Sequence, residues 1–310
     1  MPIFLTSQIT LKNCNNQFFF AINFLDSLQQ TNEIASLPSV AAKLLQMLEQ
    51  DDSDVRRIAH YVEQDVAIST KVVRVANSPI FGLRVPVASI SQAIMTIGLA
   101  RVTNIVLGVS IFSKFVYLRT LAGGFLEQFW RHSAATATLA RAIANRAKLN
   151  FQEMEFLAGL VHDIGKLAML QAEPERFRTL LETIESGTID ELEAEQQSFG
   201  ATHAEAGELI ANLWRLPSLV QGTIRLHHEG SCPVEDVAPL VAVVRVADCF
   251  AEEFGFGIGE RIEIPIESHS YWQLLAERAP QTFADPAALR EYLGGELATA
   301  SALITALMVE

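Results

Sequence analysis

The sequence has few cysteines and no long hydrophobic run. Its three cysteines, Cys14, Cys232 and Cys249, are odd in number and show no spacing typical of a disulfide framework. We therefore expect a protein of the reducing cytoplasm. No apolar run approaches the roughly 18–20 residues that a membrane-spanning helix needs. The apolar patch from Phe18 to Leu25 lacks the basic start of a signal peptide, and a helix that packs on the body is favoured.

Basic charge is also scarce. The formal net charge of the 310 residues is −13, and no stripe of lysine and arginine runs along the chain. Affinity for nucleic acid depends largely on contacts from such side chains to phosphates. Binding to nucleic acid is therefore the weakest of the functions considered below.

What the sequence does contain is a helical pattern. Half of the residues are hydrophobic, and apolar positions recur with helical spacing, as in 55–62 and 102–109. Repeated alternation of apolar and polar residues, typical of strands, is missing. The β-branched run 241–246 fits a strand or a helix, and its neighbours favour a helix. The composition and pattern predict an all-α fold with a sizeable core.

Several polar residues stand where helices are expected to begin. Ser89 with Gln92, and Thr202 with Glu205, resemble capping boxes. Asn150, with Glu153 three residues later, is expected to cap the apolar helix that contains His162. The acidic region from residue 173 to 195 is expected to be a solvated helical face.

Breaks in the helical pattern suggest how the chain is divided. The strongest is 121–124, which contains two glycines, and a further block starts near Gly255. We expect an N-terminal extension (1–30), an N-terminal helical part (31–121), a second helical part (125–253) and a C-terminal helical extension (254–310).

The stretch 155–169 carries three ionisable side chains in an apolar context. His162 and Asp163 are adjacent, and Lys166 follows after Ile164 and Gly165. Burying such groups is costly unless they pair or bind something. An exposed lysine is the simpler alternative for Lys166.

Other segments supply possible partners for this stretch. Five of the seven histidines lie between residues 132 and 228, and only His60 and His269 lie elsewhere. Asp248 follows this region and lies within an apolar segment. The candidate metal ligands are His132, His162, Asp163, His203, His227, His228 and Asp248.

This set combines imidazole nitrogen and carboxylate oxygen without thiolate. Such ligands suit divalent transition metals, with iron or manganese favoured and nickel or zinc as alternatives. Seven ligands exceed the need of one ion but would serve two ions that share a carboxylate. The alternative is that each histidine is an ordinary core or surface residue.

One resemblance is to the HD superfamily of metal-dependent phosphohydrolases, whose H…HD…D pattern is matched in order by His132, His162-Asp163 and Asp248. A second resemblance is to the HD-GYP branch of this superfamily, which hydrolyses cyclic dinucleotides, and it is carried by His203 and the pair His227-His228. Further segments resemble the HDOD domain, over about residues 31–250. They are Ile34–Val40, Glu63–Ala67, Lys71–Pro79, Ser89–Gly98, Phe199–Gly207 and Leu213–Pro217.

The resemblance implies an all-helical bacterial regulator. Its HD-like helical bundle would follow an HDOD-type N-terminal helical part. One ion would take His132, His162, Asp163 and Asp248. The second would share Asp163 and take His203, His227 and His228. Lys166 would face a phosphate, as the lysine after the HD pair does in the HD-GYP branch.

Two departures from the HD-GYP pattern affect the expected function. Gln128 stands where enzymes with three metal ions have a glutamate, so at most two ions are expected. The short segment Gly230–Pro233 replaces the glycine-rich run that ends in Gly-Tyr-Pro. Recognition of cyclic dinucleotides is therefore in doubt.

The resemblance to these families leaves two candidate functions. The favoured one is a signal-transduction regulator that acts through interactions with signalling proteins and has a metal-binding core. The alternative is a metal-dependent phosphodiesterase or phosphohydrolase that acts on a cyclic dinucleotide or another phosphate-containing molecule. In the alternative, Asp163 and Lys166 would be the catalytic residues.

Overall fold

The described residues form helices joined by turns and loops. The computed structural model describes residues 24–31, 34, 36–49, 54–121, 123–258, 265–298 and 300–308. Within these ranges there is no strand, which confirms the predicted all-α class. None of the helices in these ranges is both long enough and apolar enough to cross a membrane. Cys14 lies outside the described residues, as does most of the apolar patch 18–25.

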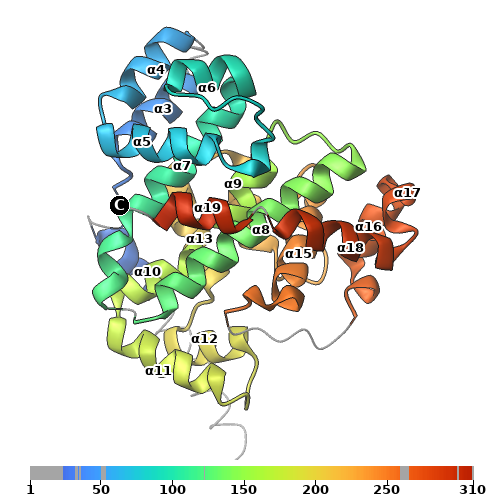
Figure 1. Cartoon of the computed structure of the whole chain (residues 1–310). Coiled ribbons are helices and arrows are strands. Elements are labelled where there is room, and N and C mark those ends of the chain that lie inside the picture. The colour runs from blue at the N-terminus through green and yellow to red at the C-terminus, as the bar shows by residue number, and fades with distance from the viewer. Residues whose placement is uncertain are drawn as a thin grey trace, which may run out of the picture.

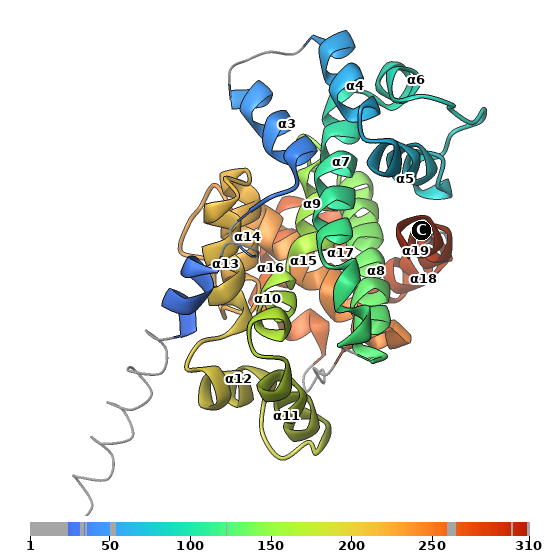
Figure 2. The ribbon, with the colours of Figure 1, turned by 90° about the vertical axis from the view of Figure 1, so that its left-hand side faces the viewer.

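Five of the helices that the structure describes make up what we call the N-terminal part; the first four lie at one end of the molecule, and the fifth extends from there into the body (Figure 1 and Figure 2). They are α3 (Ser39–Glu49), α4 (Val55–Glu63), α5 (Val66–Ala76), α6 (Ile90–Ile97) and α7 (Leu99–Lys114). A short helix, η1 (Pro79–Phe81), follows α5. Helix α7 is buried from residue 102 to 112 because it packs on α5 and also on helix α9 of the next part.

Eight helices form the second part. They are α8 (Phe125–Ala147), α9 (Met154–Val161), α10 (Ile164–Ala172), α11 (Pro174–Glu185), α12 (Glu191–Phe199), α13 (His203–Leu213), α14 (Ser218–Leu226) and α15 (Ala238–Ala251). The long helix α8 packs on α9 and α15, while α10 packs on α13 (Figure 2). The run 241–246 is helical, as its neighbours indicated. Helices α11 and α12 lie at the end opposite α4 (Figure 1).

The remaining helices return to the body of the protein. They are η3 (Glu252–Phe256), η4 (Ile266–Ser268), α16 (Ser270–Arg278), α17 (Pro280–Phe283), α18 (Pro286–Leu297) and α19 (Ala300–Met308). Helix α16 packs on α15, and α18 packs on α8. Helix α19 contacts α8 as well as α5 and η1, so it touches both the second part and the N-terminal part.

Local signals at the helix starts are mostly confirmed. Thr202 and Glu205 form a reciprocal capping box at the start of α13. The Ser89 side chain accepts a hydrogen bond from the backbone N–H of Gln92, 3.2 Å away. The Gln92 side chain accepts from the backbone N–H of Ala88 rather than that of Ser89.

The expected cap at Asn150 is wrong. Helix α9 begins one residue after Glu153, which has a φ of +66°. The side-chain oxygen of Asn150 instead accepts from the backbone N–H of Gln152 (3.0 Å). Two residues of α7 hold Glu153, since Arg101 contacts its carboxylate (2.7 Å) and Asn104 donates to its carbonyl (2.8 Å). Contacts with α7 therefore contribute to where α9 begins.

Helices α10 and α13 approach closely because glycine stands on both. A Cβ on Gly165 would lie 1.9 Å from the carbonyl oxygen of His203 and 2.7 Å from the nitrogen of Gly207. These are backbone atoms, so no side-chain rotation can relieve the clash. This close approach brings His203 next to the start of α10.

We predict that Gly165→Ala lowers the free energy of unfolding by about 3 kcal/mol, the upper end of the usual range for overpacked sites. Gly295→Ala in α18 is the matched control, because a Cβ there would meet no atom within 4 Å. Alanine favours a helix over glycine by up to about 1 kcal/mol, so the control should be neutral or stabilised. Urea denaturation measures both, and equal effects at the two positions would contradict the prediction.

Candidate metal centre

The stretch 155–169 folds as two helices rather than one. Helix α9 ends at Val161 and α10 begins at Ile164, so His162 and Asp163 lie in the break between them. On an unbroken helix, consecutive residues point about 100° apart and do not face a common point. The break allows both side chains to reach the same centre.

All seven predicted ligand residues converge on this centre. His132 comes from α8, His203 is the first residue of α13, His227 and His228 directly follow α14, and Asp248 lies in α15. His228 is half-buried, while the other six are at most 2% exposed. Six of the residues form two groups that have Asp163 in common, and Asp248 contacts His132 and His162 of one group.

The first group lies between α8, α9 and α15. His132 Nε2 is 3.2 Å from His162 Nε2 and 3.0 Å from Asp248 Oδ1. His162 Nε2 is 3.5 Å from Asp248 Oδ1 and 3.5 Å from Asp163 Oδ1. Arg245 donates to the other oxygen of Asp248 at 2.8 Å.

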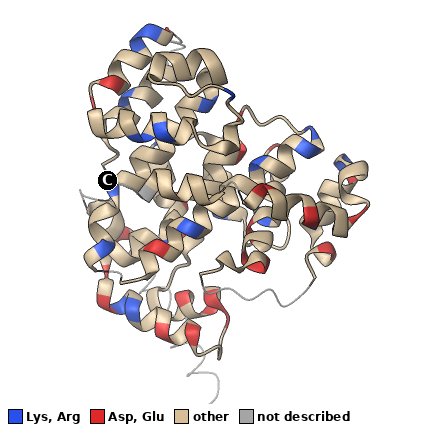
Figure 3. Ribbon diagram, viewed as in Figure 1, with Lys and Arg blue, Asp and Glu red and all other residues tan. Residues whose placement is uncertain are grey.

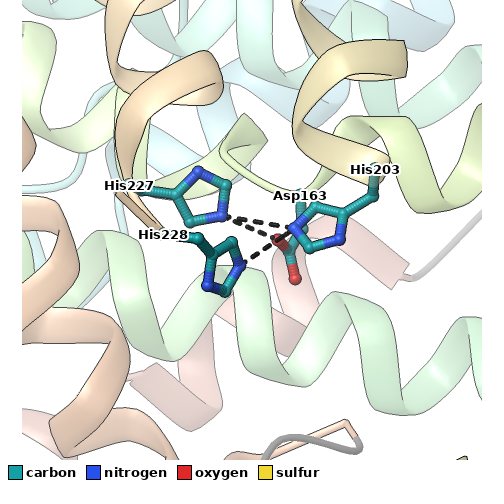
Figure 4. A group of neighbouring side chains, drawn as sticks. All are labelled: Asp163, His203, His227 and His228. Carbon is teal, nitrogen blue, oxygen red and sulfur yellow. Dashed lines mark hydrogen bonds and ion pairs between the residues drawn. The ribbon is translucent and has the colours of Figure 1, made fainter. Parts of the chain in front are cut away.

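The second group surrounds the same oxygen of Asp163 (Figure 4). Asp163 Oδ1 is 3.2 Å from His203 Nε2 and 3.3 Å from His227 Nε2. His228 Nε2 lies 3.0 Å from His203 Nε2. His203 and His227 therefore point at one carboxylate oxygen, while His228 points at His203.

The Nδ1 atoms of three histidines face backbone carbonyl groups. The pairs are His132 with Phe256 (3.1 Å), His162 with Gly159 (2.9 Å) and His227 with Ile224 (2.9 Å). A carbonyl oxygen only accepts, so each Nδ1 carries a proton and the Nε2 of the neutral ring carries a lone pair. The Nε2 lone pairs of His132 and His162 then face each other. Such a contact requires a cation, either a proton or a metal ion.

The spacing of the ligand atoms suits a metal ion. Donors about 2.0–2.1 Å from a transition metal lie roughly 2.8–3.4 Å apart at tetrahedral or octahedral angles. Most separations within the two groups fall in or near this range. Histidines whose Nδ1 donates to a carbonyl or carboxylate are also typical of metal sites, because this bond orients Nε2 towards the ion.

Both aspartates are held in the charged form that a metal ligand needs. Burial would raise the pKa of Asp163, but attraction to His162, Lys166 and His203 outweighs it and holds the pKa well below its usual value. Burial likewise opposes ionisation of Asp248, and its contacts with His132 and His162 hold its pKa well below the usual value.

The expectation that residues 173–195 form only a solvated face is wrong at two positions. Acidic residues do gather on α11 and α12 (Figure 3). However, Glu191 and Glu195 are 6% and 1% exposed, whereas Glu193 between them is exposed. Both buried carboxylates turn towards the candidate site because they share one face of α12 with the buried Ala194 and Phe199. Acids at apolar-face positions were the signal that could have identified them.

Glu195 contacts His203 at three points. Both carboxylate oxygens lie 2.8 Å from His203 Nδ1, and Oε2 accepts from the backbone N–H of His203 at 2.8 Å. Burial opposes protonation of His203, but the carboxylate of Glu195 raises the pKa of the imidazole to about 10.

Lys166 is buried, so the expectation of an exposed lysine does not hold. Its Nζ lies 2.9 Å from Asp163 Oδ2 and 3.1 Å from Glu191 Oε1. Burial would lower the pKa of Lys166, but attraction to Asp163, Glu191 and Glu195 keeps it well above its usual value. The ammonium group is thus a permanent cation engaged by two carboxylates.

We predict that Lys166→Met lowers the free energy of unfolding by about 3–5 kcal/mol, because it leaves buried carboxylates without their partner. Lys148→Met, at an exposed lysine, is the control and should change stability by less than about 0.5 kcal/mol. The double variant Lys166→Met/Glu191→Gln should recover part of the loss. A Lys166→Met protein as stable as the control variant would refute the importance of this ion pair.

Residues beyond α15 also contact the site segments. Besides the Phe256 carbonyl, the Tyr271 hydroxyl donates to the carbonyl of Leu226 (3.2 Å), next to His227. Ser270 donates to the carbonyl of Gly230 in the loop between α14 and α15. The C-terminal segment therefore contacts the ligand-bearing segments from two sides.

Comparisons with known proteins agree with this architecture. A family model described as the HDOD domain matches residues 34–230. An uncharacterized protein of Treponema pallidum is 26% identical over 253 residues, which are 82% of this chain and 48% of the relative. The chain thus spans about half the length of this curated relative.

Three solved structures show the same fold. An HDOD domain protein of unknown function from Geobacter sulfurreducens has a TM-score of 0.76 and 23% identity, covering 91% of this chain and 98% of its own. A Shewanella amazonensis protein, provisionally named a metal-dependent phosphohydrolase, has a TM-score of 0.64 and 20% identity, covering 92% and 99%. A Marinobacter aquaeolei protein, provisionally named a signal transduction protein, has a TM-score of 0.63 and 17% identity, covering 86% and 59%. At these identities the likeness concerns the fold alone.

Proposed function

The chain belongs to the HDOD domain family, and on this basis we propose that it is a bacterial signal-transduction regulator built around a dinuclear metal core. It would act through interactions with signalling proteins rather than through turnover of a substrate. The two parts of the proposal, the metal core and the regulatory role, rest on different observations.

The facing Nε2 atoms of His132 and His162 carry the proposal of a metal core. Their separation of 3.2 Å places two lone pairs in contact unless a cation lies between the rings. Four buried carboxylates, those of Asp163, Glu191, Glu195 and Asp248, lie at the site, where they contact Lys166, Arg245 and the imidazoles. Carboxylates and imidazoles gathered in this way supply the oxygen and nitrogen donors that a divalent transition metal binds.

Two ions with Asp163 in common account for all seven ligands. One would take His132, His162, Asp163 and Asp248, and the other Asp163, His203, His227 and His228. The nitrogen and oxygen donors favour iron or manganese, with nickel or zinc as alternatives.

The position of Lys166 favours regulation over hydrolysis. A lysine that clamps a phosphate must offer its ammonium group to the ligand, but Lys166 already pairs with Asp163 and Glu191. On the N-terminal part, Val85 and Met95 are each 75% exposed and line one surface depression together with Arg84. Exposed apolar groups of this kind suit contact with a partner protein. The name of the Marinobacter structure is consistent with a signalling role.

A metal-dependent phosphohydrolase is the second candidate, and the half-buried His228 favours it. This residue gives the second group of ligands a side that is less covered than the rest. Two metal ions that share a carboxylate can activate water and stabilise a leaving oxygen in phosphoryl transfer. In this reaction Asp163 would bridge the ions, and Lys166 would have to exchange Glu191 for a phosphate.

We predict that the purified protein binds two transition-metal ions per chain, measured by elemental analysis after anaerobic loading with iron or manganese. Asp163→Asn should lose both ions, since both groups share this carboxylate. His228→Ala should lose one ion. His60→Ala is the control, because His60 is exposed and lies on α4, away from the seven ligands. Metal-free wild-type protein after loading would contradict the metal core.

We also predict that the loaded protein does not hydrolyse a cyclic dinucleotide or bis(p-nitrophenyl) phosphate above the rate of the Asp163→Asn variant. Released phosphomonoester and p-nitrophenol are the measured products. Turnover that depends on metal and disappears in Asp163→Asn would instead establish the phosphohydrolase.

A further inference from the structure

Helix α12 lies behind the second group of ligands and contributes two carboxylates to it. Glu191 and Glu195 are four residues apart, so they point from the same face of the helix. Both are buried, in contrast to Glu193 on the opposite face. Burying a carboxylate costs free energy unless charged or hydrogen-bonding partners offset it.

Each of these carboxylates contacts a different site residue. Glu195 binds both the ring Nδ1 and the backbone N–H of His203. It thereby fixes the rotation of the ring and keeps Nε2 directed at Asp163 Oδ1, 3.2 Å away. Glu191 contacts Lys166, which in turn contacts Asp163 Oδ2, the oxygen that faces away from His203 and His227.

We propose that α12 is a positioning helix for the metal core, in which Glu195 orients His203 and Glu191 orients Asp163 through Lys166. This inference rests on the proposed dinuclear core and assigns a role to two residues outside the ligand set. A carboxylate on the far nitrogen of a metal-binding histidine strengthens the imidazole as a ligand, and its loss typically weakens metal binding 10- to 100-fold.

The two carboxylates differ in which ion they should affect. Among the candidate ligands, Glu195 hydrogen-bonds His203, so Glu195→Gln should weaken the ion held by His203, His227 and His228 about 10- to 100-fold. The ion held by His132, His162 and Asp248 should keep its affinity. Glu191→Gln leaves the ammonium of Lys166 to Asp163 alone, and because Asp163 is shared, both ions should weaken.

The test is a titration of the full chain with Co²⁺, followed by visible absorption and by the number of ions bound. Glu193→Gln on the exposed face of α12 is the matched control and should bind as the wild type does. Thermal melting of the metal-free variants separates positioning from folding. Selective loss of one ion in Glu195→Gln, without a lower melting temperature than Glu193→Gln, supports the inference.

Equal weakening of both ions in Glu195→Gln, or wild-type binding by both Glu191→Gln and Glu195→Gln, would overturn the inference.

A second measurement does not require metal. In the metal-free protein, ¹⁵N-histidine NMR should detect a hydrogen-bonded Nδ1 proton on His203 that shifts upfield in Glu195→Gln but persists in Glu193→Gln. If the wild type binds no metal and this signal behaves as expected, the proposal of a dinuclear core is refuted, but the positioning of His203 by Glu195 is supported. A signal that is unchanged in Glu195→Gln would refute the positioning of His203 by Glu195.

Discussion

The contacts of one carboxylate oxygen join several helices at the centre of this molecule. Asp163 Oδ1 lies within 3.5 Å of imidazole nitrogens from His162, His203 and His227, which reach it from three different segments. A charge buried among so many polar groups is tolerated only where hydrogen bonds and opposite charges surround it. The break between α9 and α10, and the glycine contact between α10 and α13, are the backbone features that allow this convergence.

Around the ligands lies a second layer of polar contacts that comes from distant parts of the chain. Helix α12 supplies two carboxylates, and the Phe256 carbonyl holds His132 from the C-terminal side. Helix α19 then connects α8, which carries His132, with α5 and η1 of the N-terminal part. Packed helices therefore connect the ligand cluster with the N-terminal part, as the proposed regulatory role requires.

In the proposed function, metal binding and hydrolysis would depend on different residues. The ligand set is the one expected of metal-dependent phosphohydrolases, and the fold resembles that of a protein provisionally named as one. Lys166, the side chain best suited to a phosphate, instead forms ion pairs with Asp163 and Glu191. The candidate ligands and Lys166 therefore have separate structural roles, because Lys166 pairs with carboxylates of the core.

The sequence by itself determined the helical class and the seven candidate ligands, because apolar periodicity and residue chemistry are local properties. It also located the caps at Ser89 and Thr202, which depend on neighbours a few residues away. Only the tertiary structure decided that α9 begins after Glu153, that Lys166 is buried, and that Glu195 faces His203. Each of these depends on contacts between separate helices, and only the packing of those helices determines which side of an acidic segment meets the core.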